Sequence, residues 1–344
     1  MDSVTSIERI AGIINRTGGR NGRPFDPATS MSTPSGRLKN WAHYGVMVPD
    51  LPAPHRFFGV MSILGTPGVA IFANDHAITS TPADTVYVSS ATGSMTDGQF
   101  FVHEIAKDCE FRSDGSRLKF GDELLIEGAY PKFALRRRHP EVEVDLEIDA
   151  TDVVSHFAHI PGLYDHWSLL ARCRGSITDR HGVLPVDTLC TVEYATGVGL
   201  HSVAPGTRAN MPVPFFTYHV LNIDERTQVL LVQVLGPAGL PIQRRVYVRG
   251  LGDHGSVHTR GFEFTVGRHL DRTTPTGSIL RLPEQLSWRV ADDRGNPLIS
   301  IDGVSNHDYS YGLGAGFVGS YDYTGTFAGR AIAGTAYMEY IDRR

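Results

Sequence analysis

The 344-residue sequence is poor in cysteine, in net charge and in long hydrophobic runs. Its three cysteines, Cys109, Cys173 and Cys190, are too few and too widely spaced for a disulfide framework or a cysteine-based zinc site. The 32 basic side chains nearly balance the 37 acidic ones, and a net charge of −5 gives no reason to expect nucleic acid as a partner. No stretch approaches the ~20 apolar residues that span a bilayer, and the first residues do not resemble a signal peptide. We therefore expect a soluble, cytoplasmic protein without a membrane span.

Turn-forming residues, in contrast, are abundant and spread along the whole chain. The 37 glycines and 20 prolines separate short runs rich in Val, Ile, Phe, Tyr and Thr, such as 228–235 and 244–248. This pattern is typical of many short strands. One helix is indicated near the start, where four isoleucines recur at helical spacing, at positions 7, 10, 13 and 14. The composition of residues 17–37, which follow, is that of a linker. The sequence predicts an all-β protein with a short N-terminal helix.

Residues 141–149 alternate strictly between acidic and aliphatic side chains. A period of two predicts a strand with one apolar and one acidic face. The acidic face either lines a groove for a cationic ligand or is solvated and pairs across the sheet with arginines. The second interpretation is favoured, with Arg136, Arg137 and Arg138 as the partners.

Two short echoes occur in the same order in each half of the chain. The first is a Phe-Phe pair, at 57–58 and again at 215–216, which opens an apolar strand that a turn and a second apolar strand follow. The second is a Glu-Tyr pair, at 193–194 and at 339–340, which closes a strand reached after a glycine. Two echoes in register indicate tandem, related β domains.

The boundary between these domains is placed near residues 202–212, where proline and glycine cluster. This gives an N-terminal helix and linker over 1–40, a first β domain over 41–205 and a second over 206–344. Antiparallel domains of this size usually close into barrels or sandwiches, because closure removes exposed strand edges.

These stretches resemble the tandem lipocalin-like proteins, which include the AttH-like proteins, bacterial carotenoid hydratase, kievitone hydratase and the fungal Diels–Alderases. Residues 215–235 are similar to the strand, polar turn and strand that open the second domain of that family. Residues 166–168 and 186–194 are similar to the end of its first domain, a strand of the form Val-x-Gly-x-Ala-Trp-x-Asp. Glu193 stands at the acidic position, although threonines replace the glycine and the tryptophan. The resemblance implies two related lipocalin-like antiparallel β-barrel domains in tandem.

Motifs of common cofactor sites are absent or out of context. Residues 314–319, GAGFVG, fit G-x-G-x-x-G, but no apolar strand precedes them and a strand-like stretch follows, which excludes a dinucleotide site. His156 and His159 are three residues apart, and His254 and His258 are four apart. Such spacings suit metal ligands on a helix, whereas these pairs lie in strand-like or glycine-rich context. We expect no metal ion and no cofactor.

Three clusters combine titratable with aromatic side chains, as a largely apolar small-molecule site with a few polar anchors requires. They lie at 41–44, 164–168 and 306–312. Each has a plain alternative: barrel core for the tryptophans, a hydrogen-bonded loop for the third cluster, and opposite strand faces for Asp165 and His166. The candidate catalytic residues are Glu193, His166, Asp165 and Asp308. The candidate ligand-binding residues are Trp41, His43, Tyr44, Trp167, Tyr194, His219, His307, Tyr309, Tyr311 and Glu339.

Glu193 and Glu339 each lie where strand alternation can aim the side chain into a barrel. A buried carboxylic acid has a raised pKa and can protonate a substrate near neutral pH. The resemblance implies such a role for Glu193, since it matches the acidic position of the family's hydratases. The alternative is a structural carboxylate that bonds Arg172 or Arg174 on a neighbouring strand.

Two functions from different classes remain open. The first is a cofactor-independent hydratase, isomerase or cyclase that acts by proton transfer and shape. Its substrate would be a hydrophobic terpenoid, polyene or polyketide-like molecule bound between or within the β domains. The second is a non-catalytic protein that binds a lipophilic ligand in the same place. A homodimer is possible in either case, and a structural β protein without a ligand is not excluded.

Overall fold

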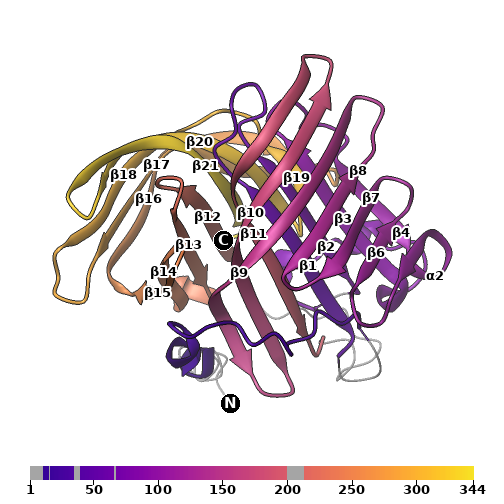
Figure 1. Ribbon diagram of the computed structural model, residues 1–344, viewed down its shortest axis with the longest axis horizontal. Helices are drawn as coiled ribbons and strands as arrows, with labels where there is room; N and C mark the ends of the chain where they lie inside the picture. Colours follow the sequence, from indigo (N-terminus) through magenta and orange to yellow (C-terminus); the bar gives the residue numbers. More distant parts are fainter. Residues whose placement is uncertain (1–10, 15, 35–38, 66, 200–212) are drawn as a thin grey trace.

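The computed structural model describes residues 11–14, 16–34, 39–65, 67–199 and 213–344. Two large antiparallel sheets lie face to face, the first in purple and magenta and the second in orange and yellow in Figure 1. The expected all-β fold is confirmed. Residues 11–14 are helical, as the isoleucine spacing predicts, whereas positions 7 and 10 lie outside the described residues. Among the residues described, no helix is long and apolar enough to cross a membrane.

The first sheet has eleven strands, in the spatial order β4-β3-β2-β1-β11-β10-β9-β8-β7-β6-β5. The strands are β1 (Trp41–Val48), β2 (Phe58–Leu64), β3 (Thr85–Thr92), β4 (Phe100–Glu104), β5 (Cys109–Phe111), β6 (Arg117–Phe120), β7 (Leu124–Ala129), β8 (Lys132–Arg137), β9 (Val142–Ile160), β10 (Tyr164–Asp179) and β11 (Gly182–Gly197). Its edge strands β4 and β5 are joined by the short helix α2 (Ile105–Asp108), so the sheet curls into a nearly closed barrel. Short 3-10 turns complete this half: η1 (Thr17–Arg20), η2 (Ala70–Phe72), η3 (Asp75–Ala77) and η4 (Pro82–Asp84).

The second sheet has ten strands, in the order β15-β14-β13-β12-β21-β20-β18-β17-β16, with β19 paired to β20. The elements are β12 (Phe215–Asn222), β13 (Thr227–Leu235), η5 (Pro237–Gly239), β14 (Pro241–Gly250), β15 (Asp253–His258), β16 (Arg260–Thr273), β17 (Ile279–Ala291), β18 (Pro297–Ser305), β19 (Ser310–Leu313), β20 (Gly316–Phe327) and β21 (Arg330–Asp342). The predicted strands at 228–235 and 244–248 are β13 and part of β14.

The two sheets repeat one topology, because in each the first strand pairs with the last. β1 pairs with β11 and β12 pairs with β21. The strands that begin and end each half of the chain therefore lie side by side in the middle of their sheet. The Glu-Tyr echo lies at equivalent places, on β11 and β21. The Phe-Phe echo does not, since Phe58 opens the second strand of its sheet and Phe215 opens the first strand of the other. The predicted boundary, 202–212, lies outside the described residues, and the limits of the domains stay a prediction.

The acidic strand is β9, and its aliphatic side chains face the core of the first barrel. On its outer face Asp145 pairs with Arg136 and Arg138 at 3.0 and 2.8 Å, as the solvated interpretation predicts. Arg137 was expected in the same row, but it points to the other face and is buried. Its guanidinium donates to Ser90 Oγ at 2.8 Å, because strand alternation turns every second side chain inward.

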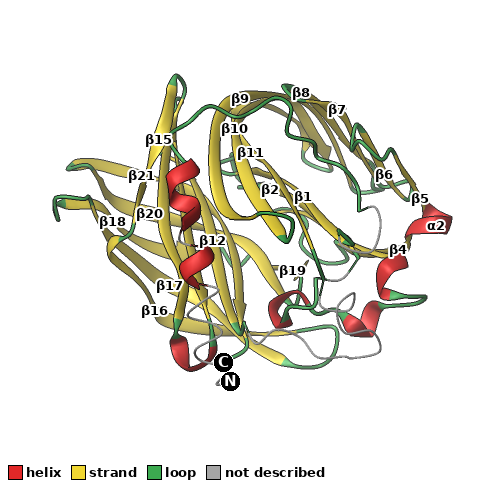
Figure 2. Ribbon diagram, turned by 90° about the horizontal axis from the view of Figure 1, so that it is seen from below, coloured by secondary structure: helices red, strands yellow, loops and turns green. Residues whose placement is uncertain are grey.

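Of the predicted linker, residues 17–20 form η1 and residues 21–34 run as a loop across one end of the first barrel (Figure 2). Residues 35–37 lie outside the described residues. Phe25 packs between Trp167 and Tyr130, with ring centroids 5.0 and 4.9 Å away. Two tyrosines inside the barrel, Tyr44 and Tyr194, donate to the backbone carbonyls of residues 31 and 32, each at 2.8 Å. Tyr44, Trp167 and Tyr194 therefore belong to the barrel core and hold this segment in place.

Replacement of both hydroxyls, in a Tyr44→Phe/Tyr194→Phe variant, is expected to free the segment at 24–34. Each lost hydrogen bond lowers the free energy of unfolding by about 0.5–1.5 kcal/mol. Urea unfolding and limited proteolysis check this, with faster cleavage expected within 24–34. Tyr323→Phe removes a hydroxyl–carbonyl contact in the second sheet and is the matched control. Equal cleavage in both variants would contradict the prediction.

Candidate functional site

The side chains of the candidate functional site lie in the layer between the two sheets. Along β1, Ala42, Tyr44 and Val46 face the core of the first barrel, whereas Met47 lies in the apolar cluster that joins the sheets. By the same alternation His43 faces the second sheet. The joining cluster is rich in aromatic rings, with Phe57, Phe157, Tyr218, Tyr247 and Tyr337 among its members.

Strand register brings three polar side chains together on that face. His43 on β1 and His166 on β10 both lie opposite Ala195, one on each side of β11. Two residues along β11, Glu193 lies between Gly45 and Ser168. The neighbours of the three functional groups are thus Ala, Gly and Ser. Because these side chains are small, both imidazoles can lean toward the same carboxylate.

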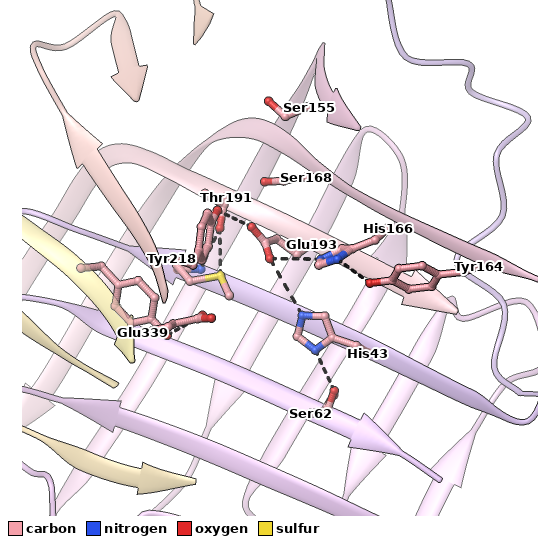
Figure 3. A network of polar contacts seen from close by, with 12 residues as sticks. His43, Ser62, Ser155, Tyr164, His166, Ser168, Thr191, Glu193, Tyr218 and Glu339 are labelled. Atoms are coloured by element: carbon pink, nitrogen blue, oxygen red, sulfur yellow. Dashed lines mark hydrogen bonds and ion pairs between the residues drawn. The ribbon is translucent and has the colours of Figure 1, made fainter. Parts of the chain in front are cut away.

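The two imidazoles converge on one carboxylate oxygen, as Figure 3 shows. Nε2 of His43 and Nε2 of His166 each lie 3.9 Å from Oε2 of Glu193. Glu193 and His43 are buried, with side chains 3% and 8% exposed, and His166 is 20% exposed. The cluster is therefore sealed on the His43 side and reaches solvent beside His166.

Each imidazole is oriented by a second partner on its other nitrogen. His43 Nδ1 donates to the carbonyl oxygen of Ser62 on β2 at 3.0 Å. His166 Nδ1 is 3.0 Å from the Tyr164 hydroxyl, and the Tyr164 ring packs on Trp41 at 5.7 Å. Trp41 and Tyr164 thus form the rim on the side of His166.

The second sheet contributes a tyrosine and another carboxyl group. Tyr218 on β12 donates its hydroxyl hydrogen to Oε1 of Glu193, a bond between the two sheets. Glu339 on β21 lies directly opposite Tyr218 and is 2% exposed. Its Oε1 accepts a hydrogen bond from Tyr337 at 3.0 Å. Figure 3 shows Glu339 below Tyr218, on the same side of the cluster.

The two carboxyl groups have pKa values shifted in opposite directions. Burial alone would raise the pKa of Glu193, but the imidazoles of His166 and His43 outweigh it and hold that pKa at about 2. Burial, reinforced by the negative charge of Glu193, raises the pKa of Glu339 well above its usual value. The raised pKa expected for Glu193 is therefore found at Glu339. Of the two groups, Glu193 is thus the one held toward the ionised form and Glu339 the one held toward the protonated form.

Arg249 on β14 is a buried cation beside this cluster, and no signal in the sequence marked it. Its guanidinium donates to the Ser168 carbonyl at 2.9 Å and to Gln228 Oε1 at 2.6 Å. Burial lowers the pKa of Arg249 to about 10. Tyr218 was also missed, although alternation along β12 places it on the face opposite to His219.

The arginines proposed as partners of Glu193 lie elsewhere. Arg172 and Arg174 both point to the outer face, where they pair with Asp187 at 2.5 and 3.4 Å. Asp165 is an ion-pair partner of His159 and does not join the cluster. Neighbours on a strand face opposite sides, which separates Asp165 from the imidazole of His166.

The other predicted residues lie in the second half of the fold. His219 is fully buried among Trp288, Tyr321 and Thr217, on the face of β12 that belongs to the core of the second sheet. Its hydrogen bonds to Thr217 and Tyr321, at 2.8 and 2.9 Å, use both ring nitrogens. This histidine is thus part of a satisfied core.

The cluster at 306–312 forms a loop that joins the sheets. Asp308 accepts from the backbone N–H of Ser320 at 2.7 Å, and burial raises the pKa of its carboxyl. The Tyr311 hydroxyl donates to Asn74 Oδ1 of the first half at 2.6 Å. Tyr309 is buried in the core of the second sheet, whereas His307 is exposed. None of these residues contacts the cluster around Glu193 among the hydrogen bonds and ion pairs of the described residues.

Two surface hollows lie away from the cluster. They have volumes of about 270 and 460 Å³ and lie over the β5–β8 region, lined by charged residues that include Lys119 and Asp122. Both hollows are ringed by charged side chains and lie apart from the aromatic residues of the joining cluster. The contact layer between the sheets, with its rim at His166, is the better candidate.

A family model described as "Family of unknown function (DUF6670)" matches residues 61–344. The chain belongs to this family. A search of curated protein sequences found no match for it.

The fold of this DUF6670 chain is similar to that of several solved structures. An AttH-type protein from Nitrosomonas europaea superposes with a TM-score of 0.58 at 14% identity, over 94% of this chain and 100% of the other. Kievitone hydratase from Nectria haematococca gives 0.57 at 13% identity, over 94% and 98%. CghA, solved with Sch210972, gives 0.50 at 8% identity, over 94% and 95%. These likenesses show that the chain shares the overall fold of these structures, as the sequence resemblance implies.

A Glu339→Gln variant is expected to gain stability relative to the wild type as the pH rises. Folded Glu339 keeps its proton, while the unfolded chain loses it above the ordinary pKa, so folding requires proton uptake. Wild-type stability therefore falls between the ordinary and the raised pKa, and glutamine removes this loss. The gap in unfolding free energy should widen by up to about 1.4 kcal/mol per pH unit.

Urea unfolding between pH 5 and pH 8 measures this gap. Glu143→Gln, on the exposed face of β9, is the control and should show a constant difference from the wild type. A constant difference for Glu339→Gln as well would show that Glu339 is already ionised in the folded protein.

Proposed function

We propose that this protein is an enzyme that transfers protons on a hydrophobic small molecule held between the two sheets. The reaction class is that of a hydratase, isomerase or cyclase, and the substrate is a terpenoid, a polyene or a polyketide-like molecule. The observation that carries the proposal is the placement of Glu339. This uncharged acid lies in an aromatic layer, opposite Tyr218 and close to a cluster of polar anchors.

Glu339 has the surroundings that a proton donor to carbon requires. Its neighbours Tyr337 and Tyr218 and the apolar side chains of the layer exclude water, which keeps the carboxyl group neutral. A neutral acid can protonate one carbon of an alkene. Water then adds to the adjacent cationic carbon, and the carboxylate left on Glu339 accepts a proton from that water. The cycle adds H and OH across the double bond and restores the acid.

The polar cluster on the first sheet supplies orientation. The Tyr164 hydroxyl at the rim can hold a hydroxyl or carbonyl group of the substrate, since Tyr164 is half-buried and its bond to His166 Nδ1 fixes its position. The rings of Trp41 and Phe157 flank that position, the latter at 4.7 Å from His166. Aromatic walls with one polar end are typical of sites that fix an apolar molecule in one pose. Folds similar to this one are found in a hydratase, which supports the proposal at the level of scaffold.

Organic extraction of natively purified protein, followed by mass spectrometry, tests the proposal. A bound hydrophobic compound is expected, and incubation with the enzyme in D₂O should place deuterium on one of its carbons. Glu339→Gln should lower the rate of incorporation about 10²–10⁴-fold while the compound stays bound. Glu143→Gln is the matched control and should keep the full rate.

Two results would overturn the proposal. If the compound returns unchanged and without deuterium, the protein is a carrier of a lipophilic ligand. If the extract is empty, retinol serves as a probe, through quenching of tryptophan fluorescence. Failure to bind retinol as well would leave no lipophilic site.

A further inference from the structure

The cluster on the first sheet has the donor set of a metal site. Two imidazole nitrogens and one carboxylate oxygen, from His43, His166 and Glu193, all lie within 4.8 Å of one another. Both nitrogen–oxygen distances are 3.9 Å. A point equidistant from three such atoms is about 2.5 Å or less from each, a few tenths of an ångström beyond the usual zinc–nitrogen and zinc–oxygen bonds. Small side-chain rotations would close that difference.

The distances do not suit direct hydrogen bonds. A separation of 3.9 Å is beyond the range of an N–H···O bond. The Nδ1 atom of His43 faces a backbone carbonyl, which can only accept, so the ring proton resides on Nδ1. The neutral tautomer that fits this contact presents the lone pair of Nε2 to the carboxylate oxygen. A metal ion between these two acceptors would satisfy both.

His166 gives an independent indication. Its Nε2 is buried and has no hydrogen-bond partner, although it points at Glu193. A buried polar atom without a partner is costly and calls for an explanation. The Tyr164 hydroxyl holds the other ring nitrogen, so the ring is fixed in an orientation that leaves this atom unused.

The surrounding contacts repeat the arrangement of known metal sites. Metal-binding histidines usually bond a carbonyl or another group through the second ring nitrogen, and binding carboxylates are themselves hydrogen-bonded. Here Ser62 holds His43, Tyr164 holds His166, and Tyr218 holds Oε1 of Glu193, which leaves Oε2 for the ion. Gly45 also keeps the place open, because a Cβ there would lie 3.1 Å from His43 Nε2.

We infer that His43, His166 and Glu193 form a binding site for a divalent transition-metal ion of the zinc type. Two imidazoles and a carboxylate are a common set for such ions, and three protein ligands leave a position open. An ion in that position polarises a bound water or carbonyl oxygen. No metal was expected from the sequence, where these three residues lie far apart and form no local motif. The inference rests on the geometry of the first sheet and not on the catalytic role proposed for Glu339.

Titration of the full-length, tag-free, EDTA-treated protein with Zn²⁺ by calorimetry tests the inference. One ion per chain is expected, together with a rise in the melting temperature. Co²⁺ should give the visible spectrum of a low-symmetry site with nitrogen and oxygen ligands. His43→Ala, His166→Ala and Glu193→Gln should each weaken Zn²⁺ binding more than about 100-fold.

Three further variants make the test decisive even if a ligand variant unfolds. Tyr164→Phe keeps all three ligands and removes only the partner of His166 Nδ1, so a 10- to 100-fold loss of affinity is expected. His159→Ala removes a nearby imidazole–carboxylate pair outside the cluster and should bind Zn²⁺ like the wild type. Glu339→Gln should also bind normally, so failure of the metal site and failure of the proposed catalysis can be told apart.

No saturable binding of Zn²⁺ or Co²⁺ to the wild type would overturn the inference. Unchanged affinity in folded His166→Ala and Tyr164→Phe variants would overturn it as well, since the ion would then lie elsewhere.

Discussion

The site depends on the pairing of the first strand with the last in each sheet. In the first sheet this pairing sets His43 across from Ala195, and the next strand sets His166 on the other side of the same residue. In the second sheet it sets Tyr218 across from Glu339. Residues more than a hundred positions apart thereby share one row. A register shift by a single residue would turn all of them to the opposite face.

The layer between the sheets has to satisfy charges that are costly to bury. A carboxylate in such a place needs hydrogen-bond donors or a cation. Among the described residues, Glu193 has Tyr218 and two imidazoles nearby and no arginine hydrogen-bonded to it, while buried Arg249 bonds to Ser168 and Gln228. The buried charge of this carboxylate is therefore met by a hydroxyl and two imidazoles.

The sequence predicted much of the fold, because alternation and the Glu-Tyr echo are local signals. They placed Glu193 and Glu339 on equivalent strands and gave the face of every second residue in β9. They could not say which face of a strand meets the other sheet. That choice determines why Tyr44 lies in the barrel core while its neighbour His43 lies in the layer between the sheets. Arg137 was misplaced because three consecutive arginines were assigned to one face, against the alternation of side chains along a strand. Tyr218 was missed because its partner belongs to the other sheet.

Each sheet alone holds only part of the site. The first carries the imidazoles and the carboxylate, and the second carries the acid and the tyrosine that bonds to that carboxylate. In the proposed function, a substrate between the sheets touches a polar anchor on one side and the proton donor on the other. The polar anchor on the first sheet would bind through its charge and lone pairs. Glu339, the proposed proton donor, can act only while it is protonated. The negative charge of Glu193 adds to the effect of burial and raises the pKa of Glu339, which favours its protonated form. The Tyr218 hydroxyl bonds to the Glu193 carboxylate that carries this charge. Because Tyr218 lies opposite Glu339 and bonds to Glu193, the two carboxyl groups influence each other although they belong to different sheets.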